Sequence, residues 1–257
     1  MTTGVARSSN KAKRDSSFAT RLQSLKEADQ DFEWYPTTKE ILQKIARAIV
    51  DDNNDNDNFR YRRSALKLLD IGAGDGQALV QLQQAMPEDR YGNRVVFDVF
   101  AIEKSVIHLT HMPKHIVVIG TEFHEQTLVE KEMDIIFCNP PYSENEERTY
   151  RILTESAAQS AYLVIPRRWR ENPRLQELVE KLKIEPKSLG EFDFENAPRN
   201  ARAKVEIVQF SMADRERDDA FNKALEEMLP GLDKFESELD QEPEPQVAWD
   251  TQIAEGG

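Results

Sequence analysis

The sequence GAGDG, residues 72–76, places the strongest constraint on the fold of this chain. An apolar run, LLDI, leads into it and a helical pattern, QALVQL, follows. Glycines at a strand-to-helix turn let the backbone turn tightly and let a ligand approach the main chain closely. We therefore expect Gly72, Gly74 and Gly76 to form a ligand-binding turn; the alternative is an ordinary tight turn. The G-x-G-x-G spacing differs from the G-x-G-x-x-G of dinucleotide-binding proteins.

Two acidic residues stand at the ends of predicted strands. Asp70 precedes the first glycine by two positions, and Glu103 ends the next strand in the sequence VFAIEKS. Glu103 lies 27 residues after Gly76. This is near the separation of roughly 20 residues expected for a carboxylate that accepts both hydroxyls of a ribose. A solvated strand end is the alternative interpretation of Glu103. Together the two acids favour a nucleoside-binding edge of the sheet.

Short apolar runs alternate with helical patterns along much of the chain. Thr38 can cap a helix whose apolar residues recur at helical spacing up to Ile49. Further helices are predicted at Ala78–Met86, Glu125–Glu130, Arg148–Gln159, Arg174–Leu182 and Arg215–Met228. Strands are predicted at Leu66–Ile71, Val95–Ile102, Ile116–Ile119, Met133–Cys138, Ala161–Ile165, Leu189–Phe194 and Val205–Met212.

The order of these elements indicates an α/β fold. Most of the first five strands are separated by helical patterns, which is typical of a parallel sheet covered on both faces. No helix separates the last two strands, and a turn-rich segment joins them. We therefore expect a Rossmann-like, mostly parallel, seven-stranded sheet that ends in an antiparallel hairpin.

The charge of the chain is unevenly distributed. The net charge is −13, and residues 213–257 hold 14 acidic and four basic residues, which leaves only −3 for residues 1–212. The acidity of the whole chain therefore does not exclude a nucleic-acid partner, because local charge decides such binding.

Three segments follow from the composition. Residues 1–30 are rich in Ser, Lys and Arg and are expected to form a flexible basic arm with a short helix near Phe18–Ala28. Residues 31–212 form the predicted catalytic domain, interrupted by a polar loop at Asp51–Asn58. Residues 213–257 are expected to form an acidic helix and a disordered tail. This tail could serve solubility, bind a protein partner or mimic nucleic acid.

The cysteine count and the hydropathy bear on location. Cys138 is the single cysteine, which fits a reducing compartment, and no apolar run approaches the ~18 residues needed to span a bilayer. We therefore expect a cytoplasmic protein with no membrane partner. Cys138 itself is expected to be a small buried residue.

The sequence NPPY, residues 139–142, directly follows the fourth predicted strand. Neither proline can donate to a sheet ladder, so the pair ends the strand and stiffens the backbone. Asn139 and Tyr142 are thereby presented in a fixed geometry. The segment is either a rigid exit loop or a preorganised polar clamp.

With these motifs in order, the chain resembles the S-adenosylmethionine-dependent amino-methyltransferases of the Rossmann-like class, above all the N6-adenine enzymes with the Dam-like motif order. The resemblance covers about Phe32 to Met212. The matching segments are FEWYPTT (residues 32–38), DIGAGDG (70–76), AIEK (101–104), GTEF (120–123) and DIIFCNPPY (134–142).

The resemblance implies S-adenosylmethionine as cofactor and a particular set of cofactor contacts. Glu103 would bind the ribose, and Glu122, which stands where the family has Asp, would bind the adenine amino group. The implied cofactor-binding residues are Tyr35, Pro36, Thr37, Asp70, Gly72, Gly74, Gly76, Glu103, Glu122 and Asn139.

The NPPY motif suits methylation of a planar amine. The lone pair of such a nitrogen is delocalised, so a catalyst must hold its protons on fixed acceptors. The Asn139 side-chain carbonyl and the Pro140 backbone carbonyl can act as these acceptors, while Pro141 stiffens the loop. Tyr142 offers a face on which a flipped base can stack. The predicted catalytic residues are thus Asn139, Pro140, Pro141 and Tyr142, with no metal ion.

A basic loop after the fifth strand is a candidate substrate contact. Arg167, Arg168 and Trp169 combine charge with an aromatic ring, as phosphate-backbone binding requires, although an exposed helix start is the alternative. By the resemblance, Phe194 in the final hairpin would lie against the target base, and Arg199 would extend the basic edge.

DNA is the favoured substrate, with RNA or a protein glutamine amide as alternatives. A non-enzymatic binding module with an acidic partner-binding tail is a further possibility. The His108, His111 and His115 group is not expected to bind a metal, because Pro113 interrupts any shared helical face.

Overall fold

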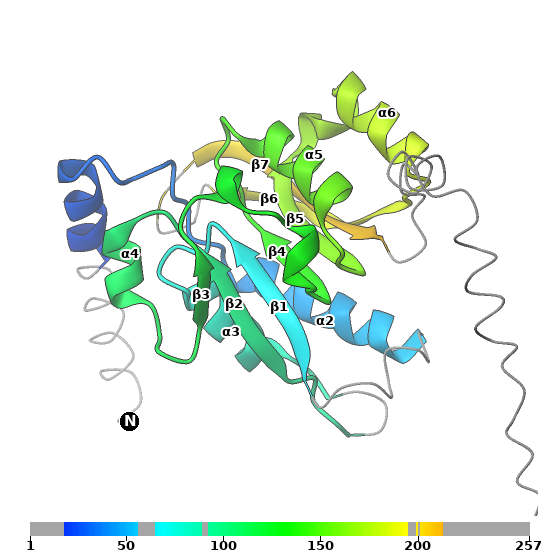
Figure 1. Cartoon of the computed structure of the whole chain (residues 1–257), viewed down its shortest axis with the longest axis horizontal. Coiled ribbons are helices and arrows are strands. Elements are labelled where there is room, and N and C mark those ends of the chain that lie inside the picture. Colours follow the sequence, from blue (N-terminus) through cyan, green and yellow to red (C-terminus); the bar gives the residue numbers. More distant parts are fainter. Residues whose placement is uncertain (1–17, 56–64, 89–91, 195–198, 200, 213–257) are drawn as a thin grey trace, which may run out of the picture. The chain divides into compact units, whose positions relative to one another are not determined.

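The computed structural model describes residues 18–55, 65–88, 92–194, 199 and 201–212. Its centre is a seven-stranded sheet in the order β3-β2-β1-β4-β5-β7-β6 (Figure 1). β1 to β5 are parallel, and β7 runs antiparallel to both β5 and β6. The strands are β1 (Leu66–Ile71), β2 (Phe97–Ile102), β3 (Val117–Gly120), β4 (Ile135–Cys138), β5 (Ser160–Pro166), β6 (Pro186–Phe194) and β7 (Ala201–Ser211). The predicted sheet and its final antiparallel hairpin are confirmed.

Helices cover both faces of this sheet. Figure 1 shows α2 (Lys39–Asp55) and α3 (Gln77–Ala85) on one side, and α5 (Asn145–Glu155) and α6 (Pro173–Lys181) on the other. Successive strand residues face opposite cores: Leu68 and Phe137 pack on the α2–α3 side, whereas Leu69 and Cys138 pack on the α5–α6 side. The near-continuous apolar runs in the sequence arise because both faces are buried.

The strand order reverses between β1 and β4, the two strands that carry the main motifs. Ile71 is paired with Cys138, so the glycine turn and Asn139 emerge side by side at the carboxyl edge of the sheet. Open α/β sheets bind ligands at such a switch point. The fold therefore brings together two motifs that lie far apart in the sequence.

Several element boundaries differ from the prediction. The predicted helix at Glu125–Glu130 is replaced by two 3-10 turns, Phe123–Glu125 and Val129–Lys131, since the Gln126 side chain instead donates to the Glu122 carbonyl at 3.0 Å. A short helix, α4 (Val106–His111), was not predicted; the Ser105 side chain caps it. Arg215–Met228 lies outside the described residues.

The polar run at Asp51–Asn58 also differs from the expected loop. α2 continues through Asp55, because the Asp52 carboxylate accepts hydrogen bonds from Tyr162, at 3.0 Å, and from Gln209. These two partners lie on β5 and β7, so the end of α2 is tied to the sheet.

Residues 18–27 form a helix where the sequence predicts a short one. Leu25 is fully buried, and Arg21 forms an ion pair with Asp75 in the glycine turn. This described part of the predicted basic arm is therefore packed on the domain. No helix in the described ranges combines the length and apolarity needed to cross a membrane.

Candidate functional site

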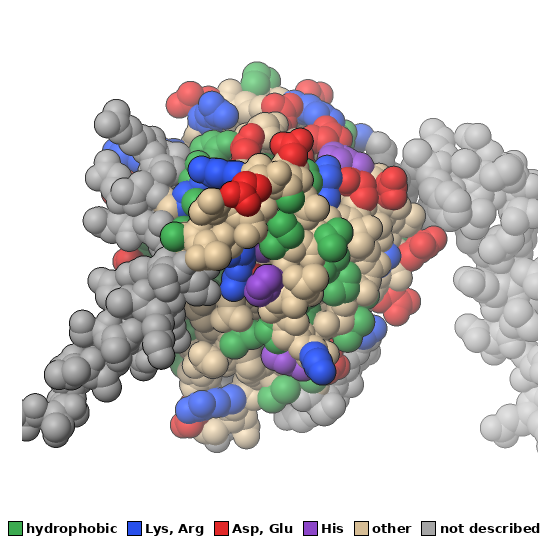
Figure 2. Space-filling model, turned by 90° about the vertical axis from the view of Figure 1, so that its left-hand side faces the viewer, with side chains coloured by type: hydrophobic (Ala, Val, Ile, Leu, Met, Phe, Trp, Pro, Cys, Tyr) green, Lys and Arg blue, Asp and Glu red, His purple; other side chains and the backbone are tan. Residues whose placement is uncertain are grey.

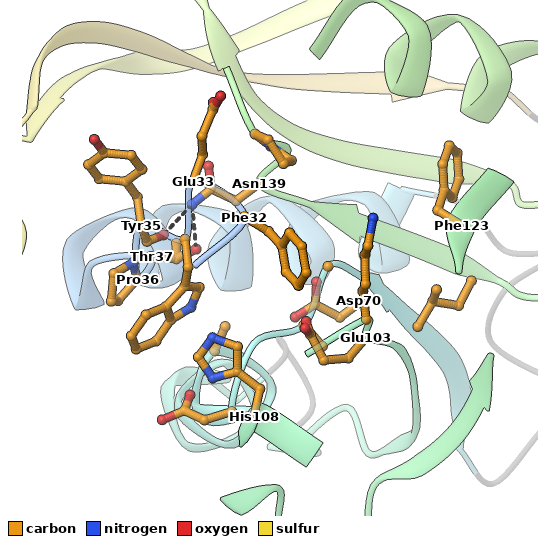
Figure 3. A pocket seen from close by; sticks show the side chains of 18 of the residues that line it. Phe32, Glu33, Tyr35, Pro36, Thr37, Asp70, Glu103, His108, Phe123 and Asn139 are labelled. Atoms are coloured by element: carbon orange, nitrogen blue, oxygen red, sulfur yellow. Dashed lines mark hydrogen bonds between the residues drawn. The ribbon is translucent and has the colours of Figure 1, made fainter. Parts of the chain in front are cut away.

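A cavity opens at the carboxyl ends of β1, β2 and β4 (Figure 3). One wall is the segment of residues 31–37, which we call the strap, and the opposite wall is formed by the ends of the strands and the start of α5. The residues that line the cavity are Asp31, Phe32, Glu33, Trp34, Tyr35, Pro36, Thr37, Asp70, Gly72, Ala73, Asp75, Gln77, Ala78, Gln81, Ile102, Glu103, Lys104, His108, Thr121, Glu122, Phe123, Phe137, Asn139, Pro141, Glu144 and Arg148.

The glycine turn has the backbone that only glycine adopts without strain. Gly72, Gly74 and Gly76 have φ angles of 80°, 57° and 73°. A Cβ on Gly74 would lie 2.5 Å from the Trp34 Nε1 atom, so the strap packs directly against the turn. The absence of side chains thus lets the strap and the cavity lie close to the main chain.

Glu103 holds the glycine turn through its two carboxylate oxygens. They accept hydrogen bonds from the backbone N–H groups of Gly74 and Ser105, each at 2.7 Å. Burial raises the pKa of Glu103, although these hydrogen bonds and the nearby Arg148 charge act in the opposite direction. Each oxygen keeps lone-pair capacity for a ligand hydroxyl, which fits the predicted ribose-binding role.

Asp70 is a second buried carboxyl group at this edge. It is 2% exposed and lines the cavity. Burial, and then the neighbouring Glu103 charge, raise the pKa of Asp70 well above its ordinary value. A buried polar group of this kind is costly without a partner, so the site is suited to a ligand that carries hydrogen-bond donors or positive charge.

Asn139 is held by the strap. Its Nδ2 atom donates to the Tyr35 carbonyl at 2.9 Å and to Thr37 Oγ1 at 3.2 Å (Figure 3). Because the Tyr35 carbonyl can only accept, these contacts determine which way the amide is turned. Oδ1 is therefore directed away from both partners and remains an acceptor, as the clamp hypothesis requires.

The rest of the NPPY segment is divided between the cavity and the core. Pro140 is buried and Pro141 lines the cavity. Tyr142 is absent from the cavity lining; it packs against the core on the α2–α3 side, and its buried hydroxyl has no partner among the described residues. Burial raises the pKa of Tyr142. In this arrangement the predicted stacking face of Tyr142 does not reach the cavity.

The strap places its predicted residues beside Asn139. Tyr35, Pro36 and Thr37 all line the cavity next to the amide (Figure 3). Glu33 also joins the strap to the loop that follows β4, because its carboxylate accepts from the Ser143 N–H at 3.1 Å. The sequence alone did not suggest this contact.

Glu122 lines the cavity at the end of β3. Its carboxylate lies 3.2 Å from the Lys104 ammonium. Although partial burial disfavours its charge, the hydrogen bond from Lys104 lowers the pKa of Glu122. Lys104 also lies over the Phe32 ring, with Nζ 4.7 Å from the ring centroid. The predicted adenine contact is thus an ion-paired carboxylate at this side of the cavity.

Sequence reasoning missed several cavity residues. Arg148 is 8% exposed and donates to Glu144 at 2.8 Å. The ring of His108 lies 4.4 Å from that of Trp34, and both its nitrogens are buried without a partner among the described residues. Burial lowers the pKa of His108 to about 4, so this ring is neutral near pH 7. The signal for Arg148 was its place on the helix that follows NPPY. His108 was considered in the sequence only as a metal ligand, and no pattern there placed it beside the cavity.

Cys138 behaves as predicted. It is fully buried, and its Sγ donates to the Ile71 carbonyl at 3.1 Å. Burial raises the pKa of the Cys138 thiol to about 12, so it remains an uncharged core residue.

The predicted substrate contacts need correction at Trp169. This side chain is 2% exposed; its Nε1 donates to Glu206 at 2.9 Å, and its ring packs against Phe210. Trp169 is therefore a core residue and cannot stack on a substrate, because its ring is buried against Glu206 and Phe210 of β7.

The basic residues around Trp169 are largely paired. Arg167 lies 3.2 Å from Glu191, Arg170 is bound to Glu206, and Arg174 to Glu147 at 2.9 Å. Arg168 is exposed and forms no ion pair among the described residues. Of the expected basic loop, Arg168 is thus the guanidinium left available for a phosphate.

The two predicted hairpin contacts differ in outcome. Phe194 ends β6, and its side chain lies outside the described residues. Arg199 does not extend a basic edge, because it is bound to the strap: it donates to both Asp31 carboxylate oxygens and to the Trp34 carbonyl. Its predicted substrate-facing role is therefore replaced by an intramolecular one.

Residues 57–166, less than half of the chain, match the model of the methyltransferase small domain. No curated protein sequence matches the chain.

Solved structures are similar in fold. A dimethyladenosine transferase from Plasmodium falciparum is 12% identical with a TM-score of 0.52, over 71% of this chain and 64% of that enzyme, so this chain spans less than two thirds of its length. The 23S rRNA methyltransferase ErmE is 14% identical (TM-score 0.47; 70% and 69% covered), and the human methyltransferase 10 domain containing protein is 16% identical (0.47; 76% and 95%). At 12% identity the likeness to the Plasmodium enzyme bears on the fold alone, and no argument rests on the two structures with TM-scores below 0.5.

The seven-stranded sheet has the Rossmann-like fold of class I S-adenosylmethionine-dependent methyltransferases, and residues 57–166 are similar to the small domain of that class. The match to the small methyltransferase domain spans β1 to β5, the part of the sheet that carries the glycine turn and NPPY. The cofactor of this class is S-adenosylmethionine, as the sequence predicts.

Proposed function

We propose that this protein transfers the methyl group of S-adenosylmethionine to the exocyclic N6 of adenine in DNA. The observation that carries the proposal is the orientation of Asn139: its Nδ2 is engaged by Tyr35 and Thr37, which leaves Oδ1 as an acceptor beside the cofactor cavity. An acceptor held in this way is suited to the proton of a planar amine.

The cavity residues fit the cofactor. Glu103 would accept the ribose hydroxyls, and Asp70, a buried carboxyl group that lines the cavity, would face the cationic part of the molecule. The open glycine turn would let the cofactor approach the main chain, and Tyr35, Pro36 and Thr37 would line its methionine end. Glu122 would lie at the adenine end. When bound, S-adenosylmethionine supplies an electrophilic methyl group on a sulfonium.

The chain's own residues would prepare the amine for attack. Asn139 Oδ1 would accept one amino proton and the Pro140 carbonyl the other, so that the nitrogen lone pair becomes less delocalised. The two prolines keep these acceptors fixed, which saves the cost of orienting them during the reaction. The proton released after transfer would leave to solvent, so no metal ion or strong base is needed.

The polymer is proposed from the motif order and from the available arginine. The sequence resembles the adenine enzymes with the Dam-like order, which favours DNA. The structurally similar Plasmodium protein is by name a dimethyladenosine transferase, which agrees with adenine as the base but names a ribonucleoside. Arg168 could contact a phosphate next to the flipped base. RNA presents the same base on a different sugar, and the experiment below separates the two.

A second candidate, methylation of a protein glutamine amide, is favoured by the charges near the site. Arg167, Arg170 and Arg174 are each neutralised by a glutamate, and Glu33 and Glu144 line the cavity. On the face shown in Figure 2, acidic and basic side chains are interspersed and form no continuous basic patch. A glutamine amide is also a planar nitrogen but carries no phosphate.

A nucleoside digest tests the proposed function. The full chain is incubated with methyl-labelled S-adenosylmethionine and a mixture of DNA, RNA and cell protein, and the products are hydrolysed and separated. We expect the label in N6-methyldeoxyadenosine. Label in N6-methyladenosine would move the substrate to RNA, and label in methylglutamine would support the second candidate. Cofactor binding with no transfer to any polymer would contradict the enzyme proposal.

Arg168 should contribute one phosphate contact to DNA binding. We expect Arg168→Ala to weaken DNA binding and to reduce the slope of log K against log salt by about 1, since one released counterion is lost. The measurement is DNA affinity by fluorescence anisotropy across a salt series. Arg174→Ala is the matched control, because Arg174 is already paired with Glu147 and should leave the slope unchanged. Equal slopes for wild type and Arg168→Ala would refute the contact.

A further inference from the structure

We infer that Arg199 is a positioning residue that fastens the strap over the cofactor cavity and, through the strap, orients Asn139. The part that concerns Asn139 rests on the proposed function. The part that concerns cofactor binding does not depend on which polymer is methylated.

Arg199 makes an unusually complete set of contacts with the strap. Its Nη2 donates to Asp31 Oδ2 at 2.9 Å, and its Nη1 donates to Asp31 Oδ1 at 2.5 Å and to the Trp34 carbonyl at 2.7 Å. The guanidinium carbon also lies 4.3 Å from the centroid of the Tyr35 ring. A planar guanidinium can make a carboxylate fork, a carbonyl contact and a ring stack together, which a lysine cannot.

These contacts are shielded from solvent. The side chains of Arg199 and Asp31 are 18% and 22% exposed, against 63% and 46% for the Arg167–Glu191 pair. An exposed ion pair stabilises little, whereas a largely buried, bidentate one holds its partners in one geometry. The Arg199 pair therefore has the properties of a structural fastening.

The strap carries this fastening to Asn139. Tyr35, which stacks on Arg199, offers its backbone carbonyl to Asn139 Nδ2 at 2.9 Å, and Thr37 accepts from the same atom. If the strap moves, Asn139 Nδ2 loses both of these acceptors. The orientation of Oδ1 thus depends on a residue that lies between β6 and β7.

The same fastening reaches the glycine turn. Trp34, whose carbonyl accepts from Arg199, packs on Gly74 and on the His108 ring. Release of the strap would therefore expose the glycine turn, on which the cofactor is proposed to lie, to solvent. We expect the loss of Arg199 to weaken cofactor binding, although no atom of Arg199 lines the cavity.

The backbone of the strap explains why a fastening is needed. Phe32 and Glu33 have φ angles of 41° and 54°, in the left-handed region that side chains other than glycine rarely adopt. Such a conformation persists only where the surroundings hold it. Asp31 and Trp34, the two residues that flank this pair, are the ones that Arg199 binds.

The test compares Arg199→Ala and Arg199→Lys in the full chain. The measured quantities are the affinity for S-adenosylmethionine, by calorimetry, and kcat and KM for DNA. We expect Arg199→Ala to weaken cofactor affinity by roughly tenfold, within the range usual for coupling between sites, and to lower kcat while KM for DNA stays unchanged. Arg199→Lys should recover little of the cofactor affinity or of kcat. Guanidinium added to Arg199→Ala should restore part of the cofactor affinity.

Two controls separate positioning from general destabilisation. Arg94→Ala removes another arginine, exposed and paired with Glu88, and should change neither affinity nor kcat. In a double-mutant cycle, Asp31→Ala combined with Arg199→Ala should be no worse than Arg199→Ala alone, because Asp31 acts on the strap through Arg199. Additive losses would overturn the inference.

The outcomes distinguish this inference from the proposed function. A rise in KM for DNA with unchanged cofactor affinity would overturn the inference and restore the substrate contact expected from sequence. A loss of cofactor affinity that guanidinium reverses would support the inference even if no polymer accepted a methyl group, in which case the proposed function alone would fail.

Discussion

The Asn139→Ala variant is expected to lose methyl transfer by a factor of about 100 to 1000 and to bind S-adenosylmethionine nearly as well as wild type; this is the loss typical when one preorganised group that stabilises a transition state is removed. Alanine leaves the strap and the glycine turn in place but removes Oδ1, the acceptor for the amino proton. The cofactor contacts of Asp70 and Glu103 are untouched. Single-turnover transfer of labelled methyl, with cofactor affinity measured in parallel, checks both expectations.

Thr37→Val provides a graded control for this prediction. It removes one of the two acceptors of Asn139 Nδ2 and keeps the Tyr35 carbonyl, so the amide should remain turned as in wild type. We expect a loss of transfer of less than about tenfold, the size of one neutral hydrogen bond. Transfer by Asn139→Ala at wild-type rate would show that this amide is not the acceptor.

The Gly74→Ala variant is expected to lose cofactor affinity by roughly ten- to 100-fold, because strain of about 1–3 kcal/mol is added at a left-handed position. The new Cβ would lie 2.5 Å from Trp34 Nε1, and the Trp34 ring is itself packed against His108 and Phe18. It cannot yield without displacing the strap, and the Gly74 N–H would shift away from Glu103. Calorimetric titration with S-adenosylmethionine measures the effect.

Gly92→Ala is the matched control. Gly92 has a comparable φ of 80°, against 57° for Gly74, but a Cβ there would meet no atom within 4 Å. It therefore carries the backbone cost of the substitution without the contact with the strap. Gly92→Ala should leave cofactor affinity unchanged; an equal loss in both variants would attribute the effect to backbone strain and stability, and would contradict a role for the Gly74–Trp34 contact.

Much of the fold could be predicted because its signals are local. β1 agrees with the predicted Leu66–Ile71 at both ends, since in the sequence its apolar run is bounded by a polar, basic segment and by glycine. The short helix Val106–His111 was missed because its start depends on the Ser105 cap and its packing on His108, a residue with weak helical preference. The predicted helix at Glu125–Glu130 fails because Gln126 bonds back to Glu122 and closes a turn.

The residues of the site could likewise be predicted where their signals are local, and not where they depend on partners far away in the chain. The glycine turn, Glu103 and Asn139 could be located because each follows directly from its own strand. The substrate contacts predicted for Trp169 and Arg199 were wrong, because the sequence shows the ring and the charge but not the residues that bind them in the fold. Trp169 is bound to Glu206, 37 residues away in the chain, and Arg199 to Asp31, 168 residues away.

The sequence by itself determined the order of the seven strands, the turn at residues 72–76 and the position of Asn139 at the end of the fourth strand, because strands and turns follow from short-range patterns of apolar residues, glycine and proline. Only the tertiary structure decided which polar side chains are free to act. An arginine forms an ion pair with a carboxylate that the fold places close to it. Arg199 is therefore paired with Asp31 and Arg170 with Glu206, while Arg168 remains exposed.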